Sequence, residues 1–478
     1  MHICIVGTGA SGWIAAHFLK NNTKIKKITI IGSDKIPTIG VGEATTHSFR
    51  EFLLNRCNLT EEEYTKFLID SDASFKYGVS YEGWSKKKFL HPFAVGQHLG
   101  YLLGKKDPDD NYHKYVSPIH NEIYNNKVYF GTDKHEYSFH FDANKFISAM
   151  TELAKLDDKI THIVDTVVES QYDDLNNVSC IITDSKKKIT ADYFVSCIGS
   201  QAFNKTIFNE EYVSYSDILL TNKAVACPLA YSDRATQSHP YTVAKAMPNG
   251  WRWITPTLSR VGTGYVFSDN HISVDEATSQ LLDDIGDREL IIDPFVVDFT
   301  PRRVKEVFKS NIATIGMAAG FLEPLDAPGL ALTLRFLTFL EDILDNIESD
   351  NIQKIKTTLN QEAVIDYDFF CSFILHQYKT CKRSDTEFWI DQKNVQFDPY
   401  DEILHQVFDP VITKANTPVY PQSVREPWMF YNSTAGKDIR WEVKIDEDLT
   451  DITETKFNEN LLFNHKELLD KMVKQSLK

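Results

Sequence analysis

The sequence lacks the signatures of several well-defined protein classes. Its seven cysteines are scattered and odd in number, which predicts reduced core residues and argues against a disulfide framework or a metal site. The apolar run at the N-terminus has no basic segment before it and is interrupted by Gly7 and Gly9, which argues against a signal peptide and a membrane-spanning helix. The sequence has no internal repeat and no low-complexity tract.

Positive charge is also scarce. Lys and Arg number 51 against 67 Asp and Glu, which gives a formal net charge of −16 over 478 residues. Such a field repels phosphate backbones and anionic lipid headgroups, so we expect no nucleic-acid partner, no membrane partner and a cytoplasmic location. The length is sufficient for two or three modules around a sizeable buried site.

The order of patterns predicts a nucleotide-binding sheet followed by helices. The first thirty residues are typical of a strand, a glycine-rich turn, a helix and a second strand, which together form a βαβ unit. Apolar segments at 193–199 and 312–316 predict further strands of this sheet. Short alternating segments at 160–195 and 224–300 predict antiparallel strands, and after Glu348 helical patterns dominate.

A glycine motif lies between the first strand and the first helix. Gly7-Thr8-Gly9-Ala10-Ser11-Gly12 fits GxGxxG, in which glycines let the backbone approach a pyrophosphate at the helix N-terminus. The acidic residue expected at the end of the second strand is missing there. Ribose binding therefore falls to Ser33, Asp34 or a backbone group, although Asp34 could equally be an exposed turn residue.

Four further segments carry chemistry-bearing patterns. Gly40 and Gly42 permit a backbone strap against a flat ligand, continuing into Glu43 and Ala44, and an ordinary turn is the alternative. A lysine, Lys76, lies among aromatic residues, although an isolated lysine is usually solvated. The other two segments are 250–256, with two tryptophans on one face of a strand, and 320–329, which opens a helix that could hold an anion.

In combination and in this order, these motifs resemble the flavin-dependent tryptophan halogenases. The resemblance rests on the GxGxxG turn, a GVGEAT strap, a lysine in an F-K-x-G setting, a GWxW signature and a Glu-Pro-Leu loop before a helix. It extends to an HY-like pair and an RxDTxFW-like helix. The matching segments are 7–12, 40–45, Phe75-Lys76-Tyr77-Gly78, Gly250-Trp251-Arg252-Trp253, Glu323-Pro324-Leu325-Asp326, His376-Gln377-Tyr378 and 383–389.

The resemblance implies a fold as well as an activity. It implies an α/β protein with a Rossmann-like, hydroxylase-type FAD-binding box, an antiparallel substrate-side sheet and a mainly helical C-terminal pyramid. We expect the FAD-binding box at 1–345, with 85–135 contributing to the substrate side. The helical substrate-side domain is expected at 346–478.

The implied activity is FADH₂-dependent halogenation of an electron-rich aromatic of the indole or phenol type. In this family a separate NAD(P)H-dependent flavin reductase supplies FADH₂, O₂ converts it to a flavin hydroperoxide, and halide attack gives hypohalous acid that reaches a catalytic lysine. That lysine is Lys76 here. Asp326 matches the second catalytic carboxylate, one methylene shorter than the family glutamate, and Glu323 matches a mainly structural glutamate.

The same resemblance implies the remaining site residues. Met317 replaces the aspartate that aromatic hydroxylases place on the ribityl chain of FAD. Trp251 and Trp253 would line the passage between flavin and lysine, while His91 and Phe93 resemble the pair that sandwiches the substrate.

The halide-binding pair departs from the family pattern. A Thr-Gly pair whose N–H groups hold chloride maps to Pro328 and Gly329, and proline has no N–H to donate. The sequence therefore predicts weaker use of chloride and relatively better use of bromide or iodide. Thr255 is a second departure, since isoleucine is usual at this position.

Several alternatives remain open from the sequence. The C-terminal substrate contacts of the family have no clear match, although Trp428, Phe430 and Tyr431 could contribute or could belong to a helical core. The substrate could thus be free or carrier-bound. A flavin-dependent aromatic monooxygenase and a non-catalytic flavin-binding relative are the rival functions, and homo-oligomerisation is left open.

Overall fold

The computed structural model of the chain describes residues 1–35, 43–46, 48–93, 120–129, 137–408, 429–430 and 462–476. Its contacts divide into two compact units that alternate along the sequence. The predicted domain division at residue 345 stays a prediction, and the compact units do not follow it. Unit 1 comprises Met1–Ala73, Phe141–Tyr215 and Thr300–Ile365, and unit 2 comprises Ser74–His140, Ser216–Phe299 and Asp366–Lys478.

A six-stranded sheet forms the centre of unit 1. Its order is β21-β22-β13-β1-β2-β9, and all neighbours are parallel except the antiparallel edge strand β21. Residues 3–6 are buried, as expected for a strand covered on both faces by other elements. The strands are β1 (His2–Val6), β2 (Lys27–Gly32), β9 (Ile160–Val164), β13 (Tyr193–Ser196), β21 (Phe308–Lys309) and β22 (Ile312–Thr314).

One strand expectation is wrong in unit 1. Strand β9 was expected to be antiparallel, but it pairs with β2 in parallel. Strand β9 is a partly exposed edge strand. Side chains alternate between the two faces of a strand next to a parallel or an antiparallel partner, so the pattern does not give the direction of pairing. The antiparallel expectation is correct for β10 (Val167–Tyr172), β11 (Val178–Thr183) and β12 (Lys188–Ile189), with Lys186 in the turn between the last two.

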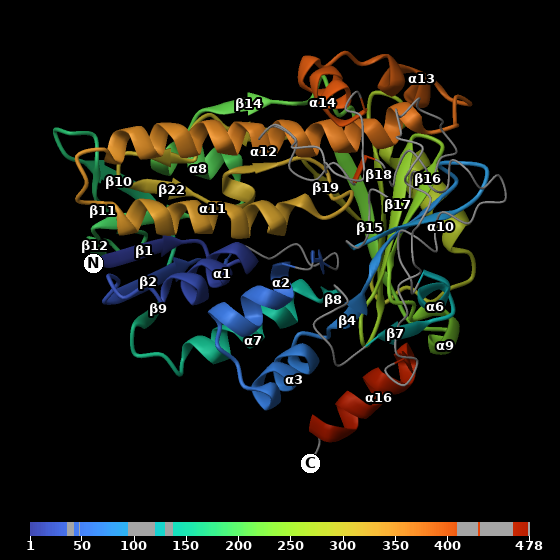
Figure 1. Cartoon of the computed structure of the whole chain (residues 1–478), viewed down its shortest axis with the longest axis horizontal. Helices are drawn as coiled ribbons and strands as arrows, with labels where there is room; N and C mark the ends of the chain where they lie inside the picture. Colours follow the sequence, from blue (N-terminus) through green and yellow to red (C-terminus); the bar gives the residue numbers. More distant parts are fainter. Residues whose placement is uncertain are drawn as a thin grey trace, which may run out of the picture. The chain divides into compact units, whose positions relative to one another are not determined.

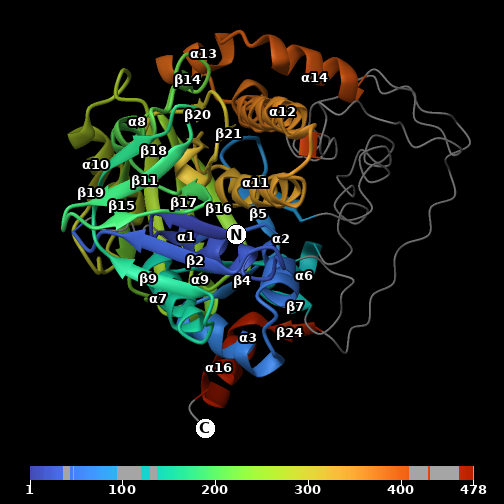
Figure 2. The same ribbon diagram turned by 90° about the vertical axis from the view of Figure 1, so that its left-hand side faces the viewer.

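Helices cover the parallel sheet of unit 1. Helix α1 (Ala10–Leu19) is apolar along almost its whole length, and it packs on β1, β2, α7 (Ala143–Ala154) and α11 (Pro328–Asp345) (Figures 1 and 2). A helix that is apolar all round requires such burial. The remaining elements of unit 1 are α2 (Ser48–Glu51), the π-helix Phe52–Arg56, α3 (Glu61–Asp70), α8 (Gln201–Phe208), β3 (Glu43–Ala44), β14 (Tyr212–Ser214), β20 (Arg302–Val304), the 3₁₀-helix η2 (Gly316–Ala318) and β23 (Gly320–Phe321).

Unit 2 is built on a seven-stranded sheet of order β19-β15-β18-β17-β16-β5-β6. Neighbouring strands are antiparallel except β16 and β5, which are parallel. Helix α10 (Val274–Ile285) packs its apolar face on β15 and β18. The strands are β5 (Gly78–Glu82), β6 (Phe89–Pro92), β15 (Lys223–Leu229), β16 (Thr242–Met247), β17 (Gly250–Pro256), β18 (Val261–Phe267) and β19 (Phe295–Asp298).

The rest of unit 2 is mainly helical. Helix α12 (Ile352–Thr380) begins in unit 1 and ends in unit 2, since the division falls within it. Two short strand pairs complete the unit, β4 with β8 and β7 with β24. The other elements are β4 (Ser74–Lys76), α6 (His120–Tyr124), β7 (Lys127–Tyr129), β8 (Ser138–Phe141), α9 (Arg234–Gln237), α13 (Glu387–Asn394), α14 (Asp398–Phe408), β24 (Leu462–Asn464) and α16 (His465–Ser476).

The expected fold class is confirmed at this level. The structure combines a parallel nucleotide-type sheet, an antiparallel sheet and a mainly helical C-terminal region. All seven cysteines are buried free thiols. Within the described residues, no helix has the length and apolarity needed to span a bilayer, and no group of His, Cys, Asp and Glu side chains is arranged to bind a metal.

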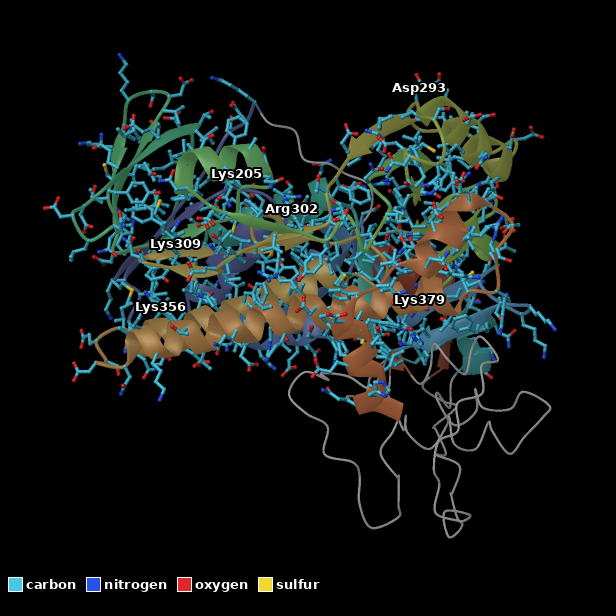
Figure 3. The ribbon with its side chains drawn as sticks, turned by 90° about the horizontal axis from the view of Figure 1, so that it is seen from above. Lys205, Asp293, Arg302, Lys309, Lys356 and Lys379 are labelled. Atoms are coloured by element: carbon cyan, nitrogen blue, oxygen red, sulfur yellow. The ribbon has the colours of Figure 1, made fainter. Side chains whose placement is uncertain are left out.

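Glu210 is a buried carboxyl of unit 1. Its side chain accepts a hydrogen bond from Thr314 Oγ1 at 3.2 Å, and the residue is only 4% exposed. Burial raises the pKa of Glu210 to about 7, although the nearby Lys309, labelled in Figure 3, acts in the opposite direction. The native state therefore holds this group as a neutral acid below about pH 7.

We expect Glu210→Gln to remove a pH-dependent loss of stability. The pKa is raised from 4.5 in the folded state, so the contribution of neutral Glu210 is complete below pH 4.5 and is lost as the pH rises through about 7. Glutamine keeps an acceptor for Thr314 and cannot ionise. Urea unfolding should show the variant gaining roughly 3 kcal/mol on the wild type between about pH 5 and about pH 8.

The matched control is Glu211→Gln, at the exposed neighbouring carboxylate that pairs with Lys305. This control should show no such gain, because the pKa of Glu211 is lowered by its hydrogen bond to Lys305. Parallel pH profiles for the wild type and Glu210→Gln would contradict the assignment.

Candidate active site

The glycine turn of unit 1 leaves room for a ligand at the start of α1. An added Cβ at Gly9, the N-cap of α1, would meet no atom within 4 Å. By contrast, a Cβ at Gly12 would lie 1.9 Å from the Gly7 carbonyl oxygen, and Gly7 itself has a φ of +121°. Gly7 and Gly12 are thus required by the turn, while Gly9 borders open space in front of the first N–H groups of the helix.

The end of β2 lies against this turn. An added Cβ at Gly32 would be 2.1 Å from Thr8 Oγ1, so the two segments approach closely. The Ser33 hydroxyl accepts hydrogen bonds from Thr166 Oγ1 at 2.8 Å and from the Lys35 N–H at 3.2 Å. Among the residues that the structure describes, none accepts the Ser33 proton, which a ribose oxygen could therefore accept. Asp34 is exposed, as the turn interpretation of this residue predicts.

The 3₁₀-helix η2 approaches the same turn from another part of the sequence. Gly316 has a φ of +68°, and an added Cβ would lie 2.1 Å from Ser11 Oγ. The next residue, Met317, is 45% exposed, which is unusual for methionine and is consistent with a ligand beside it. The structure therefore brings Ser11 and Met317 to one side of unit 1, together with Gly9 and Ala10.

A partly buried chain of hydrogen bonds supports η2. Ser196 Oγ donates to Asn204 Oδ1 at 2.6 Å, Asn204 Nδ2 donates to Tyr212 Oη at 2.6 Å, and Tyr212 Oη donates to the Ala318 carbonyl at 2.8 Å. Lys205 and Arg302, both labelled in Figure 3, lie 5.9 Å and 5.4 Å from the centre of the Tyr212 ring. This chain connects β13 to the loop that carries Met317 and holds that loop in place.

The predicted strap is described only at its end. Gly40 and Gly42 lie outside the described residues, and so does the side chain of Glu43. Glu43 and Ala44 form strand β3, with Ala44 half-buried. The role of the strap stays a prediction.

The loop before α11 has an unusual backbone. Asp326 and Ala327 both have left-handed conformations, with φ of 60° and 57°, and Pro328 is the first helical residue. Left-handed conformations cost non-glycine residues about 1–2 kcal/mol each and tend to occur at functional sites. Asp326 is half-buried, and an added Cβ at Gly329 would meet no atom within 4 Å.

Lys76 is buried in unit 2 at the end of strand β4. It is 1% exposed, and its Nζ lies 5.0 Å from the centre of the Phe93 ring. A lysine so deeply buried is rare and needs a specific environment. The alternative of an ordinary solvated lysine therefore does not apply to Lys76, and the amine lies on the face of an aromatic ring.

The glycine of the F-K-x-G segment allows β6, which carries His91, and the following Phe93 to approach the backbone closely. Gly78 pairs with Pro92, and an added Cβ there would lie 2.4 Å from the His91 carbonyl oxygen. The Phe93 N–H donates to the Tyr77 carbonyl at 3.0 Å, which fixes Phe93 beside Lys76. His91 is 5% exposed and packs on Phe373 of α12, with ring centres 5.5 Å apart.

The tryptophans of the GWxW segment form the predicted apolar wall. Trp251 and Trp253 are buried on one face of β17, with ring centres 6.5 Å apart. An added Cβ at Gly264 would lie 2.2 Å from the Trp253 ring, so glycine on β18 makes room for the indole. Arg252 points the other way and pairs with Asp284 of α10 at 2.7 Å, which anchors the strand.

An aromatic cluster extends from His91, and it includes Phe430, which the sequence left open as a substrate contact or a core residue, and Phe373, which the sequence did not single out. Phe373 and His376 of α12 both pack on Phe430, with ring centres 5.5 Å and 5.1 Å apart. Phe430 is fully buried, while Trp428 and Tyr431 lie outside the described residues. Phenylalanines at helical spacing on α12 were the available signal, but this spacing is equally typical of a core.

Comparison with known families agrees with this arrangement. The family model described as tryptophan halogenase matches residues 2–437. The chain belongs to the tryptophan halogenase family. It is therefore related to flavin-dependent enzymes, as the sequence motifs predicted.

Individual relatives cover most of the chain. Tryptophan 6-halogenase SttH of Streptomyces toxytricini is 26% identical over 434 residues, which cover 82% of this chain and 80% of SttH. Tryptophan 7-halogenase RebH of Lentzea aerocolonigenes is 27% identical over 430 residues, which cover 82% and 79%. The structure of Tar14, a tryptophan C-6 flavin-dependent halogenase from taromycin biosynthesis, superimposes with a TM-score of 0.82 at 23% identity, covering 99% of this chain and 96% of Tar14.

The residues of unit 1 fit an FAD group of this family. Gly9 borders open space at a helix N-terminus, and Ser33 and Met317 lie at neighbouring strand and loop ends. Gly7, Ala10, Ser11 and Gly12 complete the turn that would hold the pyrophosphate.

We expect Gly9→Ala to weaken FAD binding without destabilising the protein. The added methyl group meets no protein atom within 4 Å, so it can only compete with the ligand. Fluorescence titration with FAD should show at least about a tenfold loss of affinity, and the melting temperature of the FAD-free protein should be unchanged.

Gly12→Ala provides the contrast, because its methyl group would collide with the Gly7 carbonyl. This variant should lower the melting temperature as well as FAD affinity. Wild-type FAD affinity in Gly9→Ala would show that the pyrophosphate lies elsewhere.

Proposed function

We propose that the chain catalyses FADH₂-dependent halogenation of an electron-rich aromatic compound of the indole or phenol type. Membership of the tryptophan halogenase family supports the reaction class. The observation that carries the proposal is the amine of Lys76, which is 1% exposed and lies on the face of Phe93. A separate NAD(P)H-dependent flavin reductase would supply FADH₂, and the reaction would take place in the cytoplasm.

Reduced FAD, O₂ and a halide ion together supply the oxidised halogen, and the protein must then direct it. Lys76 Nζ can donate a hydrogen bond to hypohalous acid or carry the halogen as a haloamine. Either arrangement holds the electrophile at a fixed position relative to the aromatic ring, so position decides which carbon reacts. Exclusion of water by the surrounding aromatic side chains limits loss of the reactive halogen.

Asp326 is proposed to accept the proton that the ring releases. A carboxylate near the reacting ring can also polarise the electrophile. Trp251 and Trp253 are proposed to line the route of the halogen, and His91 and Phe93 to contact the substrate. The aromatic cluster with Phe373 and Phe430 supports a flat, apolar substrate on the His91 side.

We expect Lys76→Met to abolish halogenation while FAD binding is retained. Methionine fills a similar volume, so burial is preserved and only the amine is lost. The product yield should fall by at least about a thousandfold. The measurement is mass spectrometry of indoles and phenols incubated with each halide, FAD, NADH and a generic flavin reductase.

The product masses separate the proposal from its rivals. One halogen in place of one hydrogen supports halogenation, one added oxygen indicates a monooxygenase, and unchanged substrates indicate a non-catalytic flavoprotein. Halogenation by Lys76→Met at the wild-type rate would refute the role of the amine.

The halide preference is proposed to favour bromide or iodide over chloride. Pro328 is the first residue of α11 and offers no N–H, so the helix start has one donor fewer for an anion. Chloride is the hardest of the three halides to oxidise and the most dependent on hydrogen bonds. Gly329, next to Pro328, is exposed and borders open space.

We expect Pro328→Thr to shift the halide preference towards chloride. The variant adds one N–H donor for an anion at the helix start. We expect this donor to raise the ratio of chlorinated to brominated product about tenfold in competition assays. Pro324→Ala is the control, since it adds an N–H to the same loop at an exposed position outside the helix. A wild-type enzyme that prefers chloride would overturn this part of the proposal.

A further inference from the structure

The residues before and after Lys76 each donate a backbone N–H hydrogen bond on the outer edge of strand β4. One edge of β4 pairs with β8, in the register Ser74 with His140 and Lys76 with Ser138. Successive N–H groups of a strand point to opposite edges, so those of Phe75 and Tyr77 point away from β8. The Phe75 N–H donates to His465 Nε2 at 3.3 Å, and the Tyr77 N–H donates to the Pro240 carbonyl at 2.9 Å.

The acceptor for Phe75 is a side chain nearly four hundred residues further along the chain. His465 is the first residue of α16, and its own N–H donates to the Asn126 carbonyl at 2.8 Å. Strand β24, which precedes it, pairs with β7, and both strands are labelled in Figure 2. Asp470 of α16 pairs with Arg234 at 3.2 Å, so α16 is also fixed to the segment before Pro240.

The partners of the His465 ring determine its protonation. Nδ1 lies 2.8 Å from the Ser238 carbonyl, which can only accept, so Nδ1 carries the proton. Nε2 must then present its lone pair to the Phe75 N–H. Burial lowers the pKa of His465 to about 4, which keeps this neutral form at neutral pH. The ring also meets the Phe75 ring edge-on, with centres 5.9 Å apart.

Ser74, which precedes Phe75, is also held by hydrogen bonds. The Ser74 hydroxyl donates to the carbonyl of Pro256, at the end of the GWxW strand. His140 Nδ1 therefore donates to Ser74 Oγ at 3.3 Å, and its Nε2 accepts from Thr242 Oγ1 at 2.8 Å. Two buried imidazoles thus hold the residues before the lysine, His465 through the Phe75 N–H and His140 through the Ser74 hydroxyl.

We propose that His465 is a positioning residue for Lys76. Its Nε2 lone pair fixes the Phe75 amide, and this sets the direction in which the adjacent lysine side chain leaves β4. The C-terminal segment Leu462–Ser476 therefore acts as a clamp on the lysine-bearing strand. The inference rests on the proposed function, because His465 acts through Lys76 and touches no reactant.

The test compares two substitutions of one residue. In His465→Gln, the amide oxygen reaches the position of Nε2 and can still accept from Phe75. In His465→Asn, the shorter side chain places its amide near Nδ1, so it keeps the Ser238 contact and leaves the Phe75 N–H without this acceptor. Both variants remain polar and uncharged.

The first readout is hydrogen exchange of the Phe75 amide, which does not depend on activity. We expect exchange in His465→Asn to be about tenfold faster than in the wild type, and exchange in His465→Gln to stay within about threefold. The second readout is coupling, measured as halogenated product per O₂ consumed. Asparagine should lower coupling about tenfold with little change in substrate KM, and glutamine should restore it.

Melting temperatures show whether each variant is still folded at the assay temperature. If His465→Asn melts below the assay temperature, Asp470→Asn is used instead, since it loosens α16 from Arg234 without altering His465. This variant should raise Phe75 exchange and lower coupling in the same direction. Unchanged Phe75 exchange in folded His465→Asn or Asp470→Asn, or equal coupling in the asparagine and glutamine variants, would overturn the inference. A wild-type protein that halogenates no aromatic compound would instead overturn the proposed function, and the exchange comparison would still report on His465.

Discussion

The hydrogen bonds on the outer edge of β4 are the constraint on the backbone that carries the buried lysine of unit 2. A buried amine is useful for directing an electrophile only if its position is fixed, and a four-carbon side chain is not rigid by itself. The strand supplies this rigidity through Phe75 and Tyr77, whose N–H groups are held by His465 and Pro240. The aromatic ring of Phe93 then covers the amine.

Unit 1 combines a tightly packed glycine turn with open space beside it. Gly7 and Gly12 are forced by close backbone contacts, whereas Gly9 borders open space. The chain from Ser196 to Ala318 holds η2 against the same turn. The glycine turn and Lys76 thus belong to separate compact units.

The loop before α11 shows how a departure from a family pattern can be tolerated. Two consecutive left-handed residues, Asp326 and Ala327, lead into Pro328, whose fixed φ suits the first position of a helix. Leu325 and Pro328 on either side of these two residues are buried. The fold therefore accommodates proline at the first position of α11.

The sequence by itself determined the βαβ unit, the helical C-terminal region and the family, because glycine spacing and apolar periodicity are local properties. It also singled out Lys76, Trp251 and Trp253, since they lie within short contiguous motifs. Only the tertiary structure revealed the direction of β9, the cluster around Phe430 and the role proposed for His465. These depend on which distant segments meet, and no local pattern records that a single imidazole will accept a hydrogen bond from a backbone amide far earlier in the chain.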